Sequence, residues 1–531
     1  MCIIRMKLRS ALFALGVVWG SAAQVKERPL PRLAHKDGRY ALIVDGAPFL
    51  ILGAQANNSS AWPQMMPKVW SAIEYLHANT LEIPIYWEQF EPRPGQFDYT
   101  MMDRILAQAR EHRVRLVLLW FGTWKHGSQH YMPEWMKVQP ERYSHVVDKT
   151  GHPVDSPSPF AEASLDADIH AFTAFMRHLK AADPQRTVVM VQVENEPGTW
   201  GALRDYSPSA EKLYRAPVPA DVLKAMNKQA GASANWEEAF GPEAEVCFHA
   251  WSVARYIQRV AAAGKAVYPL PLYANAALRD PIKPGAPGSY ESGGPTDNVI
   301  PIYKVAAPAL DLVAPDIYMT VAAQYLKVLD LYRRDDNPLF VPETSGSADV
   351  SRFFFSALGL QAIGFSPFGL DYTSRRFDAA KPNEFLQPTA QNYKLIGPMM
   401  RDIARLNFEG KLQAVAEEKG KPVQTLPFGS WNATVSYGAL RNGPAKGNAE
   451  PSGRVLVAQL KDNQFLLAGY FCRVDFQPKD SDKRRQFLRV EEGAYEDGAF
   501  RFVRILNGDQ TDWGIDFGSE PLVLRVSLAT D

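Results

Sequence analysis

Short apolar runs alternate with amphipathic stretches along the chain up to about residue 405. Continuous apolar runs are typical of buried parallel strands, whereas apolar residues spaced three and four apart are typical of helices. Helices are predicted at residues 66–79, 101–113 and 168–182, and strands at residues 49–54, 80–87, 114–120, 187–193, 266–273, 310–318, 338–342 and 362–366. Eight strand–helix alternations predict a (β/α)8 TIM barrel rather than a doubly wound sheet.

The alternation of strands and helices ends after a helix predicted at residues 391–406. Short strands separated by Gly, Asn and Asp turns are predicted at residues 423–427, 455–458, 464–474, 499–503 and 521–528. They indicate a C-terminal all-β sandwich domain over residues 406–531, after a barrel over residues 24–405. An insertion at about residues 200–246 follows the fourth strand. We expect it over the catalytic face as a lid, a subsite wall or an oligomer contact.

The first 23 residues have the pattern of a secretory signal peptide. Basic residues stand at positions 5, 7 and 9, an apolar segment covers residues 11–20, and small residues occupy positions 21–23. An uncleaved anchor is the alternative, but a bilayer requires about 20 apolar residues and this segment is shorter. The prediction is an exported protein, periplasmic or secreted, with no membrane association after cleavage.

Charge and composition argue against nucleic-acid binding, a disulfide and a bound metal or cofactor. Lys+Arg and Asp+Glu both number 58, so no net field attracts the chain to nucleic acid. Of three cysteines, Cys247 and Cys472 remain after signal cleavage, and they fall in different predicted domains. Pairing is one alternative, but two buried free thiols are the prediction. The 10 His residues show no ligand spacing, so neither a metal nor another cofactor is expected.

Two apolar runs end in carboxylates. The run at residues 187–193 is followed by Glu194-Asn195-Glu196, and the run at residues 338–342 is followed by Glu343. Buried strands rarely end in charges unless these are paired or used, and catalytic residues of TIM barrels stand at this end. Hydrolysis of a glycosidic bond needs one carboxyl to protonate the leaving oxygen and another to attack or to activate water. Ordinary ion pairs at strand ends are the alternative interpretation.

Neighbouring side chains favour a sugar substrate. The Asn195 amide stands beside Glu196 and could hold a sugar hydroxyl. Tyr318 ends the sixth predicted strand and could donate to Glu343, although a core or rim tyrosine is an equal alternative. Indole faces suit the apolar face of a pyranose, and tryptophans cluster at or after the ends of strands one to four: Trp62, Trp87, Trp120, Trp124, Trp135 and Trp200.

Two motifs carry a resemblance to a known family. Residues 86–98, Tyr-Trp-Glu-Gln-Phe-Glu-Pro-Arg-Pro-Gly-Gln-Phe-Asp, resemble the Trp–x–x–x–Glu-Pro–x–x–Gly–x–Phe/Tyr–Asp signature of clan A retaining glycosidases. They are closest to the β-galactosidases of glycoside hydrolase family 35. Residues 192–198, Gln-Val-Glu-Asn-Glu-Pro-Gly, are similar to that family's Gln–x–Glu-Asn-Glu-Tyr-Gly. The resemblance covers about residues 40–405, and the C-terminal part looks like the accessory domain of a bacterial subgroup.

The resemblance implies roles for particular residues. Glu196 would be the acid/base, Glu343 the nucleophile and Asn195 the contact of the sugar 2-hydroxyl. The substrate-binding residues expected in addition are Tyr86, Trp87, Trp124, Trp200 and Tyr318. The chain departs from the family at several positions: Glu88 and Phe90 stand where the family has Asn and His, and Pro197 stands where it has Tyr. The family's Cys-Ala-Glu-Trp, which binds the galactose hydroxyls, has no clean counterpart in residues 121–126.

The expected function is that of a retaining exo-β-galactosidase acting on plant-derived oligosaccharides or polysaccharides by double displacement. Its partner would be a glycan substrate, and a homo-oligomer is an allowed assembly. Two alternatives remain open. One is another clan A activity, namely a β-glucosidase, β-mannosidase or endo-glycanase, and the other is a glycan-binding barrel without catalysis.

Overall fold

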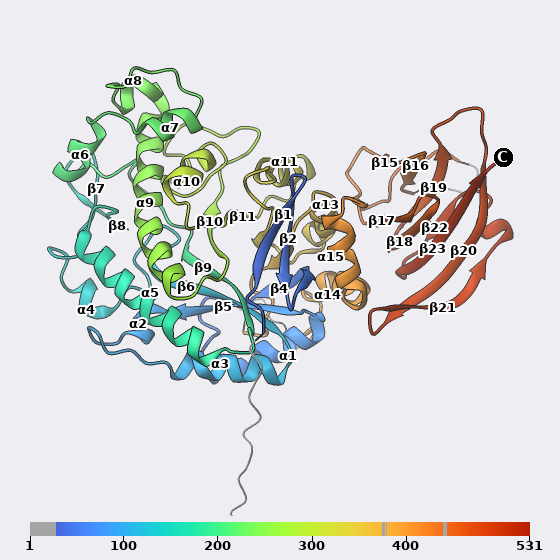
Figure 1. Cartoon of the computed structure of the whole chain (residues 1–531), viewed down its shortest axis with the longest axis horizontal. Helices are drawn as coiled ribbons and strands as arrows, with labels where there is room; N and C mark the ends of the chain where they lie inside the picture. Colours follow the sequence, from blue (N-terminus) through green and yellow to red (C-terminus); the bar gives the residue numbers. More distant parts are fainter. Residues whose placement is uncertain (1–27, 374–377, 379, 439–442) are drawn as a thin grey trace, which may run out of the picture.

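The computed structural model describes residues 28–373, 378, 380–438 and 443–531, so the predicted signal peptide lies outside the described residues. Its larger unit is a closed barrel of eight parallel strands surrounded by helices (Figure 1). The strands, in chain order, are β4 (Ile51–Gln55), β5 (Thr80–Tyr86), β6 (Arg115–Lys125), β9 (Val188–Asn195), β10 (Leu272–Ala277), β11 (Leu312–Ile317), β12 (Val341–Thr344) and β13 (Gly364–Pro367). All eight overlap the predicted strands, which confirms the TIM barrel.

The helices cover the barrel because each presents an apolar stripe to it. In α1 (Met66–Leu76), Val69, Ile73 and Leu76 are buried at helical spacing. The other helices of the barrel unit are α2 (Trp87–Phe90), α3 (Thr100–Glu111), α4 (Glu134–Lys137), α5 (Glu162–Ala182), α6 (Pro208–Tyr214), α7 (Ala220–Ala225), α8 (Trp236–Phe240), α9 (Ala244–Val267), α10 (Ile300–Ala306), α11 (Ala322–Tyr332), α12 (Ala348–Ser351), α13 (Phe353–Gly359), α14 (Gln387–Ile396) and α15 (Met400–Phe408).

Several predicted boundaries differ from the observed ones, and two of the differences have a clear cause. The strand expected from residue 266 begins at Leu272, because the long amphipathic helix α9 continues to Val267. The single helix expected at residues 391–406 is instead α14 and α15, separated by the 3-10 turn Gly397–Met399. Pro398 explains the interruption, since proline lacks the backbone N–H that an α-helix interior requires.

The C-terminal part is a sandwich of two antiparallel sheets, as predicted. One sheet has the order β14-β17-β18-β23-β20-β21 and the other β15-β16-β19-β22. Their bounds are β14 (Leu412–Ala416), β15 (Val423–Phe428), β16 (Trp431–Ser436), β17 (Arg454–Lys461), β18 (Gln464–Tyr470), β19 (Cys472–Pro478), β20 (Arg485–Glu496), β21 (Ala499–Leu506), β22 (Ile515–Phe517) and β23 (Leu522–Thr530). Val435 of one sheet and Val457 of the other belong to a single core cluster.

Smaller elements complete the chain. An antiparallel sheet is formed by β1 (Arg32–Lys36), β2 (Arg39–Val44) and β3 (Ala47–Phe49), and a hairpin by β7 (His145–Val147) and β8 (Pro153–Pro157). Cys247 and Cys472 are both free and buried, as expected. Of the helices in the described residues, none combines the length and the hydropathy needed to span a bilayer.

Helices α13, α14 and α15 connect the barrel to the sandwich (Figure 1). Arg454 of β17 is buried at this junction, and its Nε donates to Oδ1 of Asn392 in α14 at 3.0 Å. Arg454 also donates to the hydroxyl of Tyr470, which in turn donates to the same Asn392 oxygen. The two units therefore share buried polar contacts.

Candidate active site

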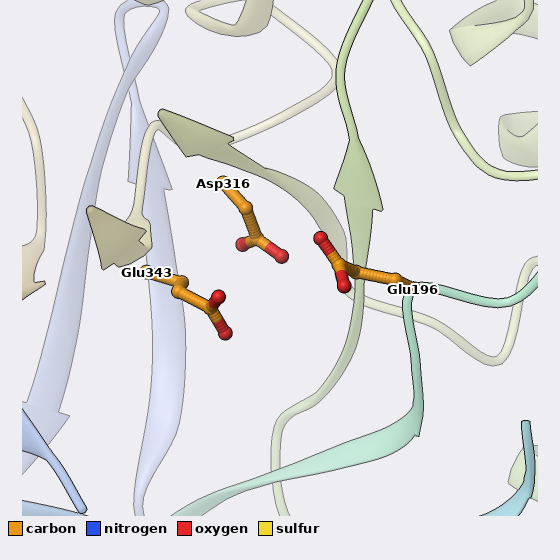
Figure 2. A group of neighbouring side chains, drawn as sticks. All are labelled: Glu196, Asp316 and Glu343. Atoms are coloured by element: carbon orange, nitrogen blue, oxygen red, sulfur yellow. The ribbon is translucent and has the colours of Figure 1, made fainter. Parts of the chain in front are cut away.

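The carboxyl ends of the barrel strands, among them β6, β9, β10, β11 and β12, surround a cavity of about 820 Å³. Glu196, Asp316 and Glu343 project into it from the ends of β9, β11 and β12 (Figure 2). One carboxylate oxygen of each lies within 4.8 Å of one oxygen of each of the other two. The other lining residues are Asn58, Lys125, His126, His130, Tyr131, Trp200, Ala277, Leu278, Tyr318, Met319 and Phe368. The predicted pair Glu196 and Glu343 thus meets at one mouth, with a third acid between them in the fold.

An unusual backbone directs Glu196 into the cavity. Glu194 and Glu196 have φ angles of 64° and 43°, in the left-handed region that non-glycine residues rarely adopt. The backbone N–H of Glu196 donates to Oδ1 of Asn275 at 2.8 Å, and its carbonyl accepts from the N–H of Gly127 at 3.0 Å. Such strained residues persist where the surroundings fix them, and they occur often at functional sites.

Glu343 is held by two hydrogen-bond donors. The amide of Gln55 donates to its Oε2 at 2.9 Å, and the hydroxyl of Tyr318 donates to its Oε1 at 2.7 Å. This second bond agrees with the contact predicted for Tyr318. Burial raises the pKa of Glu343 and the charge of Glu196 raises it further, while Lys125 and the two donors oppose the rise.

Glu196 has cationic neighbours instead. Nδ1 of His126 donates to its Oε2 at 2.8 Å, and the ammonium of Lys125 lies 3.9 Å from the same oxygen. Burial alone would raise the pKa of Glu196, but His126 and Lys125 outweigh it and hold the pKa below its usual value. A general acid works best with a raised pKa, whereas a nucleophile must stay ionised and needs a low one. The lowered pKa of Glu196 and the raised pKa of Glu343 are therefore opposite to the shifts expected for an acid at Glu196 and a nucleophile at Glu343.

Asp316 is the most isolated of the three acids. Nδ2 of Asn275 donates to its Oδ2 at 2.5 Å, whereas no donor among the described residues reaches its Oδ1. Burial, followed by the charges of Glu343 and Glu196, raises the pKa of Asp316 well above its usual range. Within the described residues the three carboxylates are also the one group whose oxygens could surround a metal ion. Lys125 already supplies a positive charge beside them, and the chemistry of a carboxyl pair needs no metal.

Two of the residues expected to bind substrate line the cavity. Trp200 is 44% exposed and its ring centroid lies 6.0 Å from that of His126. Tyr318 is 47% exposed and presents its ring to the same space. Both rings are accessible to a sugar, and Trp200 stands at the start of the predicted insertion.

The other four expected sugar contacts need correction. Trp87 and Trp124 are fully buried, the first bonded to Glu91 through its indole N–H, so neither ring face can meet a sugar. Tyr86 is 2% exposed and lines a separate pocket of about 310 Å³ beside Trp62. Asn195 is also fully buried, and its amide finds no hydrogen-bond partner among the described residues. The place of a residue in a motif therefore did not show whether its side chain reaches the cavity or is buried in support of a strand end.

Sequence reasoning missed the residues that surround the two glutamates. Four side chains outside the predicted site contact a cavity carboxylate or its backbone: Gln55, Lys125, His126 and Asn275. None of them belongs to the two motifs from which the site was predicted. Asp316 could have been noticed, because an acid inside the apolar segment at residues 310–318 repeats the signal that identified Glu196 and Glu343.

Two family models match parts of the chain. Residues 58–258 match glycoside hydrolase family 42, described as beta-galactosidase, and residues 389–518 match a domain of unknown function (DUF5597). The first match supports a clan A glycosidase domain but not family 35, which the motifs had suggested. The second begins in α14 and covers most of the sandwich. The chain matches no curated protein.

Solved structures share the barrel at low sequence identity. A cold-adapted β-galactosidase from Rahnella sp. R3 has 14% identity and a TM-score of 0.50, over 67% of this chain and 58% of its own. A β-galactosidase from Bacillus circulans sp. alkalophilus has 14% identity and a TM-score of 0.49, over 67% of this chain and 57% of its own. This chain thus covers somewhat over half the length of these relatives. At these identities the likeness establishes the fold alone, and the family model adds that residues 58–258 are similar to glycoside hydrolase family 42.

Proposed function

We propose that the protein is a retaining β-glycosidase that removes terminal β-D-galactosyl residues from plant-derived oligosaccharides or polysaccharides. The observation that carries the proposal is the separation of Glu196 and Glu343, whose nearest carboxylate oxygens lie within 4.8 Å. Retaining glycosidases hold their two carboxyl groups about 5–5.5 Å apart, whereas inverting enzymes leave roughly 6.5–9.5 Å for a water molecule. This spacing supports double displacement.

In the proposed reaction Glu343 attacks the anomeric carbon, forms an ester with the sugar and breaks the glycosidic bond. Glu196 gives its proton to the departing oxygen, and then takes a proton from the water that hydrolyses the ester. Gln55 and Tyr318 favour the ionised nucleophile through their hydrogen bonds to Glu343. Trp200 and Tyr318 offer aromatic faces to the sugar ring.

The finer parts of the proposal have separate support. The galactoside preference is supported by the description of the matched family model and by the two motifs. A cavity of about 820 Å³ suits one terminal sugar with part of its neighbour. Export remains a proposal that depends on the basic, apolar and small segments of residues 1–23.

A panel of aryl β-glycosides, with the first-formed product anomer followed by NMR, tests this function. The expected result is turnover of the β-galactoside with release of β-galactose. Turnover of a β-glucoside or β-mannoside alone would overturn the galactose assignment. Release of the α-anomer would overturn retention, and binding without hydrolysis would identify a non-catalytic barrel.

Exchange of either carboxyl for an amide should abolish catalysis without unfolding the protein. We expect Glu343→Gln to lower kcat by roughly 10³-fold or more, because an amide cannot serve as the nucleophile. Glu196→Gln should lower it by about 10²–10⁴-fold on substrates with poor leaving groups. Glu162→Gln is the matched control, since Glu162 pairs with Arg259 on the surface. Wild-type rates in either active-site variant would contradict the assignment.

A further inference from the structure

In the free site, the proton needed for catalysis can reside on any of three carboxyl groups, those of Glu196, Asp316 and Glu343. Glu196 must carry a proton to act as an acid, yet His126 and Lys125 favour its ionised form. Three carboxyl groups this close cannot all be ionised without strong mutual repulsion, so the group as a whole retains a proton. The question is which carboxyl holds it.

The hydrogen bonds single out Asp316. Glu343 accepts two hydrogen bonds, and Glu196 faces a histidine and an ammonium, so both are stabilised as anions. Asp316 is 3% exposed and receives a donor on Oδ2 alone, while its Oδ1 has none among the described residues. A protonated Asp316 can donate to Glu196, whose side chain lies within hydrogen-bonding reach. The charged or titratable groups that act on Asp316 or respond to it are Lys125 (β6), Glu196 (after β9), Tyr273 (β10), Tyr318 (after β11), Tyr332 (α11) and Glu343 (β12).

We propose that Asp316 is the neutral carboxylic acid of the free site and supplies the proton that Glu196 delivers to the leaving group. Asp316 acts through Glu196 and is therefore a positioning residue. The inference rests on the proposed glycosidase function. The strand register supports it, because Asp316 of β11 pairs directly with Glu343 of β12. The side chain of Asn275 links Asp316 to Glu196. Its Nδ2 donates to Asp316, and its Oδ1 accepts from the backbone N–H of Glu196.

The proposed proton cycle balances. In the first step the O–H bond of Asp316 breaks as that of Glu196 forms, and the O–H bond of Glu196 breaks as the leaving oxygen is protonated. Glu343 loses its negative charge by forming the ester while Asp316 gains one, so the three groups keep a total charge of about −2 throughout. In the second step water gives a proton to Glu196 and its oxygen to the sugar. The ester bond breaks, Glu343 regains its charge, and the proton returns to Asp316.

This cycle has a physical driving force. Much of the resistance of Asp316 to ionisation comes from the charge of Glu343 nearby, after the effect of burial. Attack by Glu343 removes that charge at the moment when a proton is required. The proton on Asp316 is therefore released as the covalent bond forms and is recovered as the bond breaks.

The variant Asp316→Asn tests the proposal, because asparagine keeps the shape and the acceptor for Asn275 but has no acidic proton. For a β-galactoside with a poor leaving group, kcat/KM should fall about 10²–10⁴-fold. For the 2,4-dinitrophenyl β-galactoside, whose leaving group needs little protonation, kcat/KM should stay within about tenfold of the wild-type value. In the variant Glu196 takes its proton from solvent against Lys125 and His126, so the high-pH limb of kcat/KM should move to lower pH.

A second readout does not depend on catalysis. The infrared spectrum at neutral pH should lose one protonated-carboxyl band in Asp316→Asn, with unchanged thermal unfolding. The matched control is Asp311→Asn, at the other end of the same strand, where Asp311 pairs with Lys265; its leaving-group dependence and pH profile should equal those of the wild type.

Three outcomes would overturn the inference. One is an equal fall on both galactosides with an unmoved pH profile, which is what a structural role predicts. Another is an infrared spectrum in which no protonated-carboxyl band is lost. The third is a wild-type rate that rises with added Mg²⁺ or Ca²⁺ and falls with a chelator, which would assign the carboxylates to a cation. No hydrolysis of any glycoside by the wild type would instead remove the proposed function, and the infrared band would still report on Asp316.

Discussion

At the scale of single residues, the site depends on which side chains donate to which carboxylate. The Tyr318 hydroxyl is a donor to the proposed nucleophile, and a hydrogen bond to a carboxylate favours its ionised form. The contact to Glu343 was one of two equal alternatives that the sequence left open for Tyr318. The cationic neighbours of Glu196 were not expected, because Lys125 at the end of β6 and His126 just after it meet Glu196 only once the barrel has closed.

Tyr318→Phe should raise the pKa of Glu343, because the lost hydrogen bond opposes the rise caused by burial. A smaller fraction of Glu343 is then ionised at acidic pH, so the low-pH limb of kcat/KM should move to higher pH. We expect kcat/KM at neutral pH to fall by roughly tenfold or more, because a hydrogen bond to a charged group contributes about 1.5–3 kcal/mol.

The pH profile of the purified variant checks this prediction. Tyr206→Phe is its control, since Tyr206 also donates to a glutamate, Glu245, but away from the cavity. A low-pH limb that stays in place in Tyr318→Phe would show that the hydroxyl does not stabilise the anion of Glu343.

At the scale of elements, the turn after β9 positions the proposed acid. Gly198 sits two residues beyond Glu196, and a Cβ there would lie 2.8 Å from the carbonyl oxygen of Ser292 and 2.9 Å from the side chain of Glu291. Both distances are shorter than real contacts of a Cβ. The close approach of the segment around Ser292 therefore requires glycine at this position.

Gly198→Ala should destabilise the protein by about 1–3 kcal/mol, because overpacking forces the backbone to shift. The displaced turn should also lower kcat. Thermal unfolding and kcat together measure the effect. Gly231→Ala in the insertion provides the comparison, since a Cβ added there would have nothing within 4 Å and the φ of Gly231 is not positive. Equal unfolding temperatures for the two variants would show that the turn has room to adjust.

The elements also show how far the sequence could be read. All eight barrel strands were predictable, because strands covered on both faces leave continuous apolar runs such as residues 187–193. In the sandwich, β14, β16, β20 and β22 were missed. Strand β20 buries only two of its twelve residues and carries five charged ones, so it lacks the apolar alternation that identifies a strand. The break between β18 and β19 was also hidden, since it depends on the left-handed backbone of Phe471 (φ 55°).

At the scale of the whole molecule, barrel and sandwich are joined by a buried polar contact. Arg454 bonds Asn392 of the barrel unit and Tyr470 of the sandwich. Arg454→Ala should lower the free energy of unfolding by about 2–3 kcal/mol, because it removes the buried hydrogen bonds that the charged guanidinium makes across the junction. Denaturant unfolding measures this loss.

Arg484→Ala serves as the reference for that loss, since its side chain is 86% exposed and lies 3.5 Å from Asp531. A surface ion pair of this kind contributes about 0–1 kcal/mol. If the two variants lose the same stability, the junction is not a stabilising interface.

The central claim is that Glu343 forms a covalent bond to the sugar opposite Glu196. Incubation with a 2-deoxy-2-fluoro-β-galactoside bearing an activated leaving group slows the second step and should trap the ester. Mass spectrometry of the intact protein and its peptides measures the result. The account predicts one added fluorogalactosyl group, located on the peptide that contains Glu343. A label on another residue, or turnover without any covalent species, would contradict it.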